Sequence, residues 1–141
     1  MATTPSNHFK YQLADKQIDL SVDTIKACLM STAYAFDADA HATYADVSAS
    51  ELSTGNGYTA GGATLTTLAL AEDDTNDRAE MTCDDVQWDA SGGSIGATGA
   101  AIIYDSTTAD NTVIMCVDFG TDYTIPAGSS FILKDIAIRV A

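Results

Sequence analysis

The feature that most constrains this chain is a glycine-dense segment that leads directly into a threonine-rich apolar run. Residues 53–70 read STGNGYTAGGATLTTLAL. The glycines permit positive φ angles that side chains with a Cβ resist, so a tight turn is expected around them. The β-branched and apolar run over residues 63–70 is typical of a strand packed against a core. The segment therefore predicts a turn that delivers a core strand.

Short strand signals recur along the rest of the chain, separated by polar or glycine-rich turns. Residues 24–30 alternate between two faces, and residues 100–104 are apolar on both faces, as in a central buried strand. In residues 80–88 the alternation slips at Asp84 and Asp85, which indicates a bulge or a tight bend. Further strands are expected over residues 9–20, 112–119 and 131–140, with turns at 72–78, 91–99, 106–111 and 126–130.

Residues 31–50 differ in composition from these strands. They are rich in alanine and aspartate, and we expect mostly loop there, with a short helix around residues 40–47. No segment has the length and period of a long amphipathic helix. The predicted fold class is therefore all-β: an antiparallel β-sandwich or jelly-roll-like barrel with long loops and at most one short helix.

The 141 residues suffice for one domain and are too few for two well-filled cores. We expect residues 1–8 to form a flexible N-terminal arm and residues 9–141 to form a single β-sandwich domain. Residues 1–9 lack the basic and then apolar pattern of a secretory signal, and no run approaches the roughly 18 apolar residues of a membrane helix. The sequence thus favours a soluble protein made in the cytoplasm.

The charge of the chain is strongly one-sided, with 20 acidic residues against six basic ones and a formal net charge of −14. Binding to nucleic acid requires lysine and arginine to replace counterions on phosphates, so neither DNA nor RNA is an expected partner. Anionic membrane surfaces are disfavoured for the same reason. The acidity either keeps a many-copy exposed protein soluble or is simply a solvated surface.

The three cysteines, Cys28, Cys83 and Cys116, are widely separated and form no CxxC pair. Each lies in an apolar strand-like run, so we expect buried, reduced thiols that behave as small hydrophobic side chains. A disulfide between two of them would require neighbouring strands, and the sequence leaves that alternative open.

Two histidines are the only candidates for acid–base chemistry at neutral pH. His8 lies in the expected arm. His41 has Asp37 and Asp39 nearby, which makes an acid–base pair or a metal site conceivable, against the plainer interpretation of a surface histidine in an acidic loop. No nucleophile, base and orienting group can be assembled, so no catalytic residues are predicted and a non-enzymatic protein is expected.

Two aspartate-rich loops were compared with calcium-binding loops. Residues 74–78 place the cation Arg78 at the fifth position, and residues 37–42 lack the required glycine. A weak, adventitious calcium site stays open, but no cofactor or metal ligand set is predicted.

The GYTAGG segment at residues 57–62 is not a phosphate-binding loop, because no lysine follows it and it precedes a strand rather than a helix. It either meets the backbone requirements of a turn or presents Tyr58 as an exposed anchor for a partner. Trp88 is expected in the core rather than on a binding platform.

Four segments in order resemble the small β-rich virion proteins of tailed bacteriophages. The GYTAGG segment matches their GYTxGG signature, and residues 23–30 (DTIKACLM), 85–88 (DVQW) and 101–104 (AIIY) with 117–120 (VDFG) fit the same pattern. The resemblance covers residues 9–140. It implies a capsid decoration protein, also called a cement or head accessory protein, on the outside of the virion head.

The resemblance also implies the partners. Such proteins bind the major capsid protein and associate with themselves, often as homotrimers. The loops at residues 31–50 and 72–78 vary in these proteins, so no docking residues carry over to this chain. Two alternatives remain: a neck, tail or fibre-base protein of the same virion, and a carbohydrate- or calcium-dependent binding module.

Overall fold

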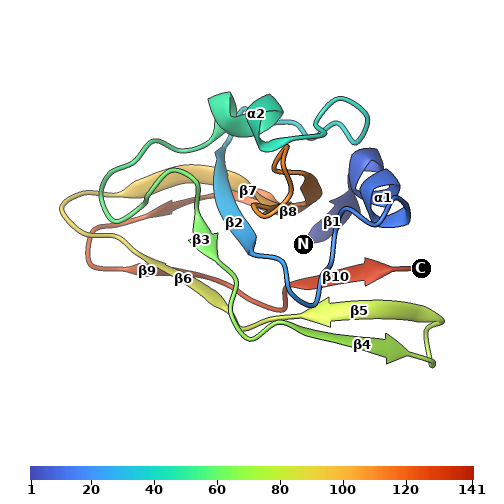
Figure 1. The fold of residues 1–141 in the computed structure, drawn as a ribbon. Helices are drawn as coiled ribbons and strands as arrows, with labels where there is room; N and C mark the ends of the chain where they lie inside the picture. Colours follow the sequence, from blue (N-terminus) through green and yellow to red (C-terminus); the bar gives the residue numbers. More distant parts are fainter.

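Two layers of antiparallel strands face each other in the computed structural model, which describes all residues 1–141 (Figure 1). The upper layer is a five-stranded sheet with the order β1-β8-β7-β2-β3. Its strands are β1 (Ala2–Pro5), β2 (Ile25–Ser31), β3 (Ala63–Thr64), β7 (Ile95–Asp105) and β8 (Val113–Ile125). The predicted all-β antiparallel sandwich is confirmed.

Strand β7 is the centre of the upper layer, as the two-sided apolar pattern of residues 100–104 predicts. It pairs with β2 on one side and β8 on the other, so that Ile102 stands opposite Cys28 and Cys116. Both faces of the sheet are buried here, because a core lies below it and residues 31–50 cover it from above.

The lower layer contains the three-stranded sheet β10-β5-β4, with β4 at Ala69–Asp73, and the two-stranded sheet β6-β9, and two of its chain segments break at the same level. Strand β5 (Arg78–Thr82) is followed by β6 (Val86–Asp89), and β9 (Ser130–Leu133) is followed by β10 (Ala137–Val140). Because Thr82 pairs with Ala137 and Val86 with Leu133, the two breaks lie opposite each other. The irregularity predicted at Asp84 and Asp85 is therefore confirmed. The break in the predicted strand 131–140 was not foreseen.

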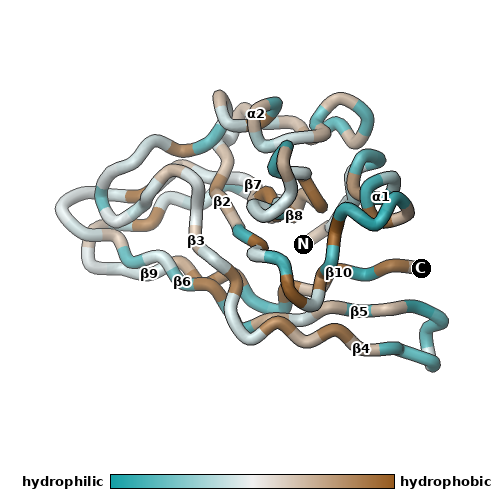
Figure 2. Tube along the Cα trace, viewed as in Figure 1, coloured by the Kyte–Doolittle hydropathy of each residue, from teal (hydrophilic) through white to brown (hydrophobic).

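Apolar side chains gather in two clusters, one on each face of the upper sheet. The larger cluster fills the space between the layers and includes Ile25, Leu29, Met81, Trp88 and Ile103. Trp88 is thus a core residue, as predicted. Figure 2 shows the hydrophobic stretches on the strands that enclose this space, and the hydrophilic ones on helix α1 (Asn7–Ala14) and at the tip of the hairpin formed by β4 and β5.

The smaller cluster lies on the opposite face of the sheet. Cys28, Met30, Ile102 and Val113 contribute to it, and residues 31–50 cover it. That segment contains the predicted short helix, α2 (Tyr44–Val47), followed by one 3₁₀ turn, η1 (Ser48–Ser50). Residues 31–50 therefore form a lid that packs onto the sheet, and the side chain of Val47, which belongs to the lid, is buried against the sheet.

The N-terminal expectations need correction. Residues 2–5 are not a free arm but the edge strand β1, paired with β8, and residues 7–14 form a second helix, α1 (Asn7–Ala14), where strands were expected. The Ser6 hydroxyl caps α1 by accepting a hydrogen bond from the Phe9 amide at 2.9 Å. The capping serine and the i, i+4 spacing of Phe9 and Leu13 were the signals that predict this helix.

The strand predicted over residues 63–70 also needs correction, because it is split between the layers. Residues 63–64 form β3 at the edge of the upper sheet, and residues 69–73 form β4 (Ala69–Asp73), which pairs with β5 in the lower layer. Between them the chain crosses the sandwich through Leu65, which is buried, and Thr67, whose φ is 57°. The apolar pattern marks burial, but it does not show the change of layer.

Two glycines of the turn are fixed by close backbone approach. A Cβ on Gly62 would lie 2.0 Å from the Ala27 carbonyl oxygen in β2, and one on Gly57 would lie 2.0 Å from the carbonyl oxygen of Asp89, the last residue of β6. Both residues also have positive φ. The turn therefore touches the upper layer with one end and the lower layer with the other.

We predict that Gly62→Ala destabilises the protein far more than Gly128→Ala. Both glycines have similar φ, +79° and +86°, but nothing lies within 4 Å of a Cβ at Gly128. Gly128→Ala should cost only the strain of the left-handed conformation, roughly 1–2 kcal/mol. Gly62→Ala adds the clash and should cost more than about 4 kcal/mol. Urea unfolding of the two variants checks this, and equal losses would contradict the packing argument.

Candidate functional site

A single carboxylate, that of Glu51, ties the glycine turn to the lid. Its Oε1 accepts hydrogen bonds from the Tyr58 hydroxyl at 2.6 Å and from the Gly61 amide at 2.7 Å. Its Oε2 accepts a hydrogen bond from the Tyr44 hydroxyl on α2. The Tyr58 hydroxyl in turn accepts a bond from the Leu29 amide of β2 at 2.9 Å.

Tyr58 is 2% exposed, so the interpretation of this side chain as an exposed anchor is wrong. Burial and the neighbouring Glu51 carboxylate raise its pKa, which keeps the hydroxyl protonated and donating. Tyr104 completes the arrangement: it stacks on Tyr44 with ring centres 4.7 Å apart and donates to the Gly61 carbonyl at 2.6 Å. The GYTAGG segment thus has a structural role: it connects strand β2 to Glu51 and, through Glu51, to the lid.

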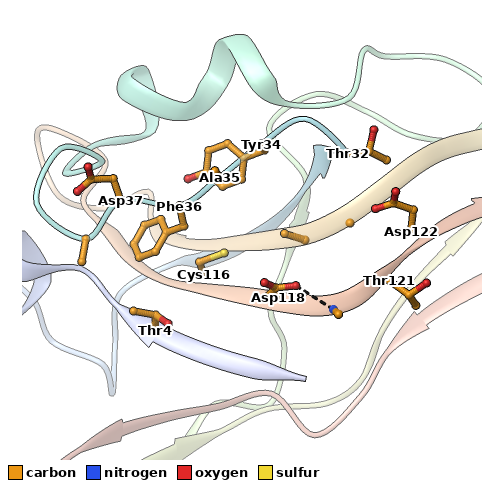
Figure 3. Close-up of a pocket in the computed structure, with 14 residues that line it drawn as sticks. Thr4, Thr32, Tyr34, Ala35, Phe36, Asp37, Cys116, Asp118, Thr121 and Asp122 are labelled. Atoms are coloured by element: carbon orange, nitrogen blue, oxygen red, sulfur yellow. Dashed lines mark hydrogen bonds between the residues drawn. The ribbon is translucent and has the colours of Figure 1, made fainter.

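A large groove lies where the lid stops short of the sheet edge. This groove has a volume of about 1010 Å³ and runs between β1, β8 and the start of the lid. In Figure 3, Tyr34 and Phe36 lie over Cys116 at one end, and Asp118, Thr121 and Asp122 lie at the other. The groove therefore has aromatic rings beside Asp37 at one end and two further carboxylates, with polar side chains, at the other.

Local turns hold the groove in shape. The Asp118 carboxylate accepts a bond from the Gly120 amide at 2.8 Å. The Asp37 carboxylate accepts bonds from the amides of Asp39 and Ala40, and these bonds lower the pKa of Asp37 below its usual range. Asp37 therefore stays charged and caps its own turn.

The sequence candidates for chemistry are dispersed. The His41 Nδ1 lies 3.0 Å from the Tyr34 hydroxyl and accepts a hydrogen bond from the Asp37 amide at 3.1 Å. His41 therefore contacts the backbone of Asp37 and not its carboxylate. His8 contacts Asp110 at 2.7 Å, far along the chain. No three His, Cys, Asp or Glu side chains are placed to share a metal ion.

The cysteines are free thiols. Cys28 and Cys116 are buried as predicted, and Cys83 is half-buried. Because β7 separates β2 from β8, Cys28 and Cys116 lie two strand spacings apart, about 9–10 Å, which is too far for a disulfide. Burial raises the pKa of the Cys116 thiol to about 12, so this groove-lining thiol is not a nucleophile at neutral pH.

One buried carboxyl group stands apart from the groove. Asp105, at the end of β7, is 0% exposed, and its Oδ2 has no donor within reach. Its Oδ1 accepts the Thr107 amide at 2.8 Å. Burial, together with a hydrogen bond shared with the Asp23 carboxyl, raises the pKa of Asp105 to about 7. The negative charge of Asp23 acts in the same direction, so Asp105 takes up a proton more readily than an exposed aspartate does.

Comparison with protein-family models, with curated protein sequences and with solved structures yields no match to this chain. Neither helix has the length and apolar character needed to cross a bilayer.

We predict that Asp105→Asn stabilises the protein at alkaline pH and flattens its pH dependence. The pKa of Asp105 is higher in the folded protein than in the unfolded chain. Its contribution to the free energy of unfolding is therefore fully present below about pH 4 and is lost as the pH rises towards 7. The asparagine amide supplies a permanent donor towards Asp23, which should add about 1–3 kcal/mol at pH 8. Urea unfolding between pH 4 and 8 measures this.

The control for this experiment is Asp89→Asn. Hydrogen bonds from Ser130 and Gln87 lower the pKa of Asp89, so its contribution is present at neutral pH and lost in acid. Asp89→Asn should therefore have the opposite sign, weakening the protein at pH 7 and not at pH 3. An Asp105→Asn profile parallel to that of the unmodified protein would contradict the raised pKa of Asp105.

Proposed function

We propose that this chain is a non-enzymatic structural protein of a tailed-phage particle that binds the outer surface of the capsid and stabilises the shell. In this proposal it acts as a decoration protein in the virion, with the major capsid protein and further copies of itself as partners. Neither nucleic acid nor a membrane takes part.

The observation that carries the proposal is the mutual contact of the segments that resemble phage virion proteins. Gly62 of the GYTAGG segment packs against Ala27 of the 23–30 segment. The Tyr58 ring of the GYTAGG segment lies 6.4 Å from the Trp88 ring of the 85–88 segment. Residues 101–104 pair with residues 26–29, and Ala101 also pairs with Val117. The segments are far apart in sequence and contact one another in the fold, which is what an ordered resemblance at the level of the fold requires.

The groove suits attachment to a repetitive surface. It is open and combines half-buried aromatic rings with carboxylates, a composition suited to a basic or aromatic segment of another protein. Each copy needs only a modest interface, because a lattice of sites supplies multivalency. The net charge of −14 would also limit association between particles.

The proposal is tested by titrating purified protein onto mature and unexpanded capsids and counting the copies bound per particle. We expect stoichiometric, saturable binding that covers the expanded shell. A handful of copies per particle would assign the protein to a vertex, neck or tail instead. Absence of binding to either particle would contradict the proposal.

We predict that Asp122→Arg weakens capsid binding at least tenfold, or about 1.4 kcal/mol, because it reverses a charge inside the groove. The matched control is Asp85→Arg, which reverses one exposed carboxylate between β5 and β6 in the lower layer. Both variants change the net charge equally. Equal weakening by the two would show that overall charge, and not the groove, governs binding.

A second candidate, a carbohydrate-binding module, gains support from the groove's aromatic end. Tyr34 stacks on His41 with ring centres 5.3 Å apart, and Asp118 and Asp122 offer acceptors at the other end. A glycan screen followed by calorimetry separates the two functions: saturable binding of a free glycan that Asp122→Ala abolishes would favour the module.

A further inference from the structure

The three-stranded sheet of the lower layer has a free edge on each side. Its order is β10-β5-β4, and neither β10 nor β4 pairs with another strand. No backbone hydrogen bond outside these strand pairs involves residues 69–72 or 137–140. Unpaired edges are templates for pairing with another chain, and proteins usually protect them with lysine, proline or a bulge.

Strand β4 contains no lysine, proline or bulge, and its two charged residues, Glu72 and Asp73, lie only at its far end. Its first three residues are Ala69, Leu70 and Ala71, all exposed, and its pairing with β5 is regular. Leu70 is 46% exposed. Figures 1 and 2 show β4 at the outer side of a hairpin that projects from the body, apolar along the strand and hydrophilic at its tip. An exposed apolar edge of this kind is expected to have a partner.

The two edges differ in charge. The end of β4 and the turn after it are acidic, with Glu72, Asp73 and Asp74 in succession. On the other side of the sheet, Arg139 in β10 donates from its Nε to Glu80 while its two Nη groups contact no carboxylate. Lys134 and Lys10 line hollows that also include Arg139, and neither lysine forms a salt bridge. Half of the six basic residues therefore flank β10.

We propose that β4 of one copy pairs with β10 of a second copy, so that the lower layer continues from subunit to subunit. The contact places the acidic hairpin of one copy beside the basic flank of the next. Because the two surfaces are different, the association is head-to-tail and closes into a ring when the rotation between subunits permits. The inference gives a surface to the self-association in the proposed function, and it does not depend on the capsid.

Pairing of β4 with a second β4 is less favourable. It would bring two acidic hairpins together, in a chain that already carries a net charge of −14, and would leave the basic flank of β10 unused. Charge complementarity thus selects β10 as the partner edge.

The test measures molar mass by light scattering and native mass spectrometry over a dilution series. We expect an oligomer for the unmodified chain and the 14.7 kDa of one chain for Leu70→Lys, because a lysine on the edge blocks pairing and faces the basic flank. Val22→Lys is the matched control: Val22 is 75% exposed and lies outside every strand, so this variant should assemble normally.

Mixing two variants tests the head-to-tail arrangement. Arg139→Glu should also be monomeric, but an equimolar mixture with Leu70→Lys should form a dimer, since one variant retains β10 and the other retains β4. Circular dichroism establishes that each variant is folded. A monomeric unmodified chain, an oligomer that survives Leu70→Lys, or normal assembly of Arg139→Glu would each overturn the inference.

Capsid occupancy of the same variants separates this inference from the proposed function. Unmodified protein that assembles through these edges but does not bind capsids would contradict the function alone. Protein that binds capsids at full occupancy while remaining monomeric in solution and on the shell would contradict the edge pairing alone.

Discussion

The structure depends on the contact between the glycine turn and strand β2. Gly62 approaches the Ala27 carbonyl so closely that no side chain fits, and four residues earlier the Tyr58 hydroxyl bridges the Leu29 amide and the Glu51 carboxylate. A buried hydroxyl without hydrogen-bond partners costs about 1–3 kcal/mol. The contact of Tyr58 with Leu29 and Glu51 is therefore strongly specified. Through Glu51 the same contact reaches α2 and fixes the lid over the second face of the sheet.

The lid and the free edges give the protein two kinds of surface with different physical character. The groove exists because the lid covers the sheet above Cys116 and leaves Asp118 and Asp122 open, so its shape follows from where Glu51 anchors the chain. The edges β4 and β10 exist because no further strand pairs with either side of the β10-β5-β4 sheet. One surface is suited to a partner of opposite charge and the other to a repeated copy, which together fit a protein that works in an array.

Strands that are buried in the same way along their whole length were predicted correctly from the sequence. The prediction failed where the chain passes from one layer to the other. Residues 100–104 are apolar on both faces and form a central strand, and the slip at Asp84 and Asp85 marks a true break. Residues 63–70 look uniform but cross between layers, because hydrophobic periodicity reports burial and not which sheet supplies it. Helix α1 was not predicted, although the capping residue Ser6 and the i, i+4 spacing of Phe9 and Leu13 indicate it. The groove could not be predicted, since Thr4, Phe36 and Asp122 meet only through tertiary packing.

The most direct test of this account is a double-mutant cycle between Glu51 and Tyr58, measured by the free energy of unfolding. The account predicts that Glu51→Ala and Tyr58→Phe each destabilise the protein and that their effects are coupled by roughly 1–3 kcal/mol, because they share one buried network. Protection of the lid amides against hydrogen exchange should fall in Glu51→Ala. Effects that add to within about 0.5 kcal/mol, with the lid as protected as before, would contradict the claim that this carboxylate fastens the fold.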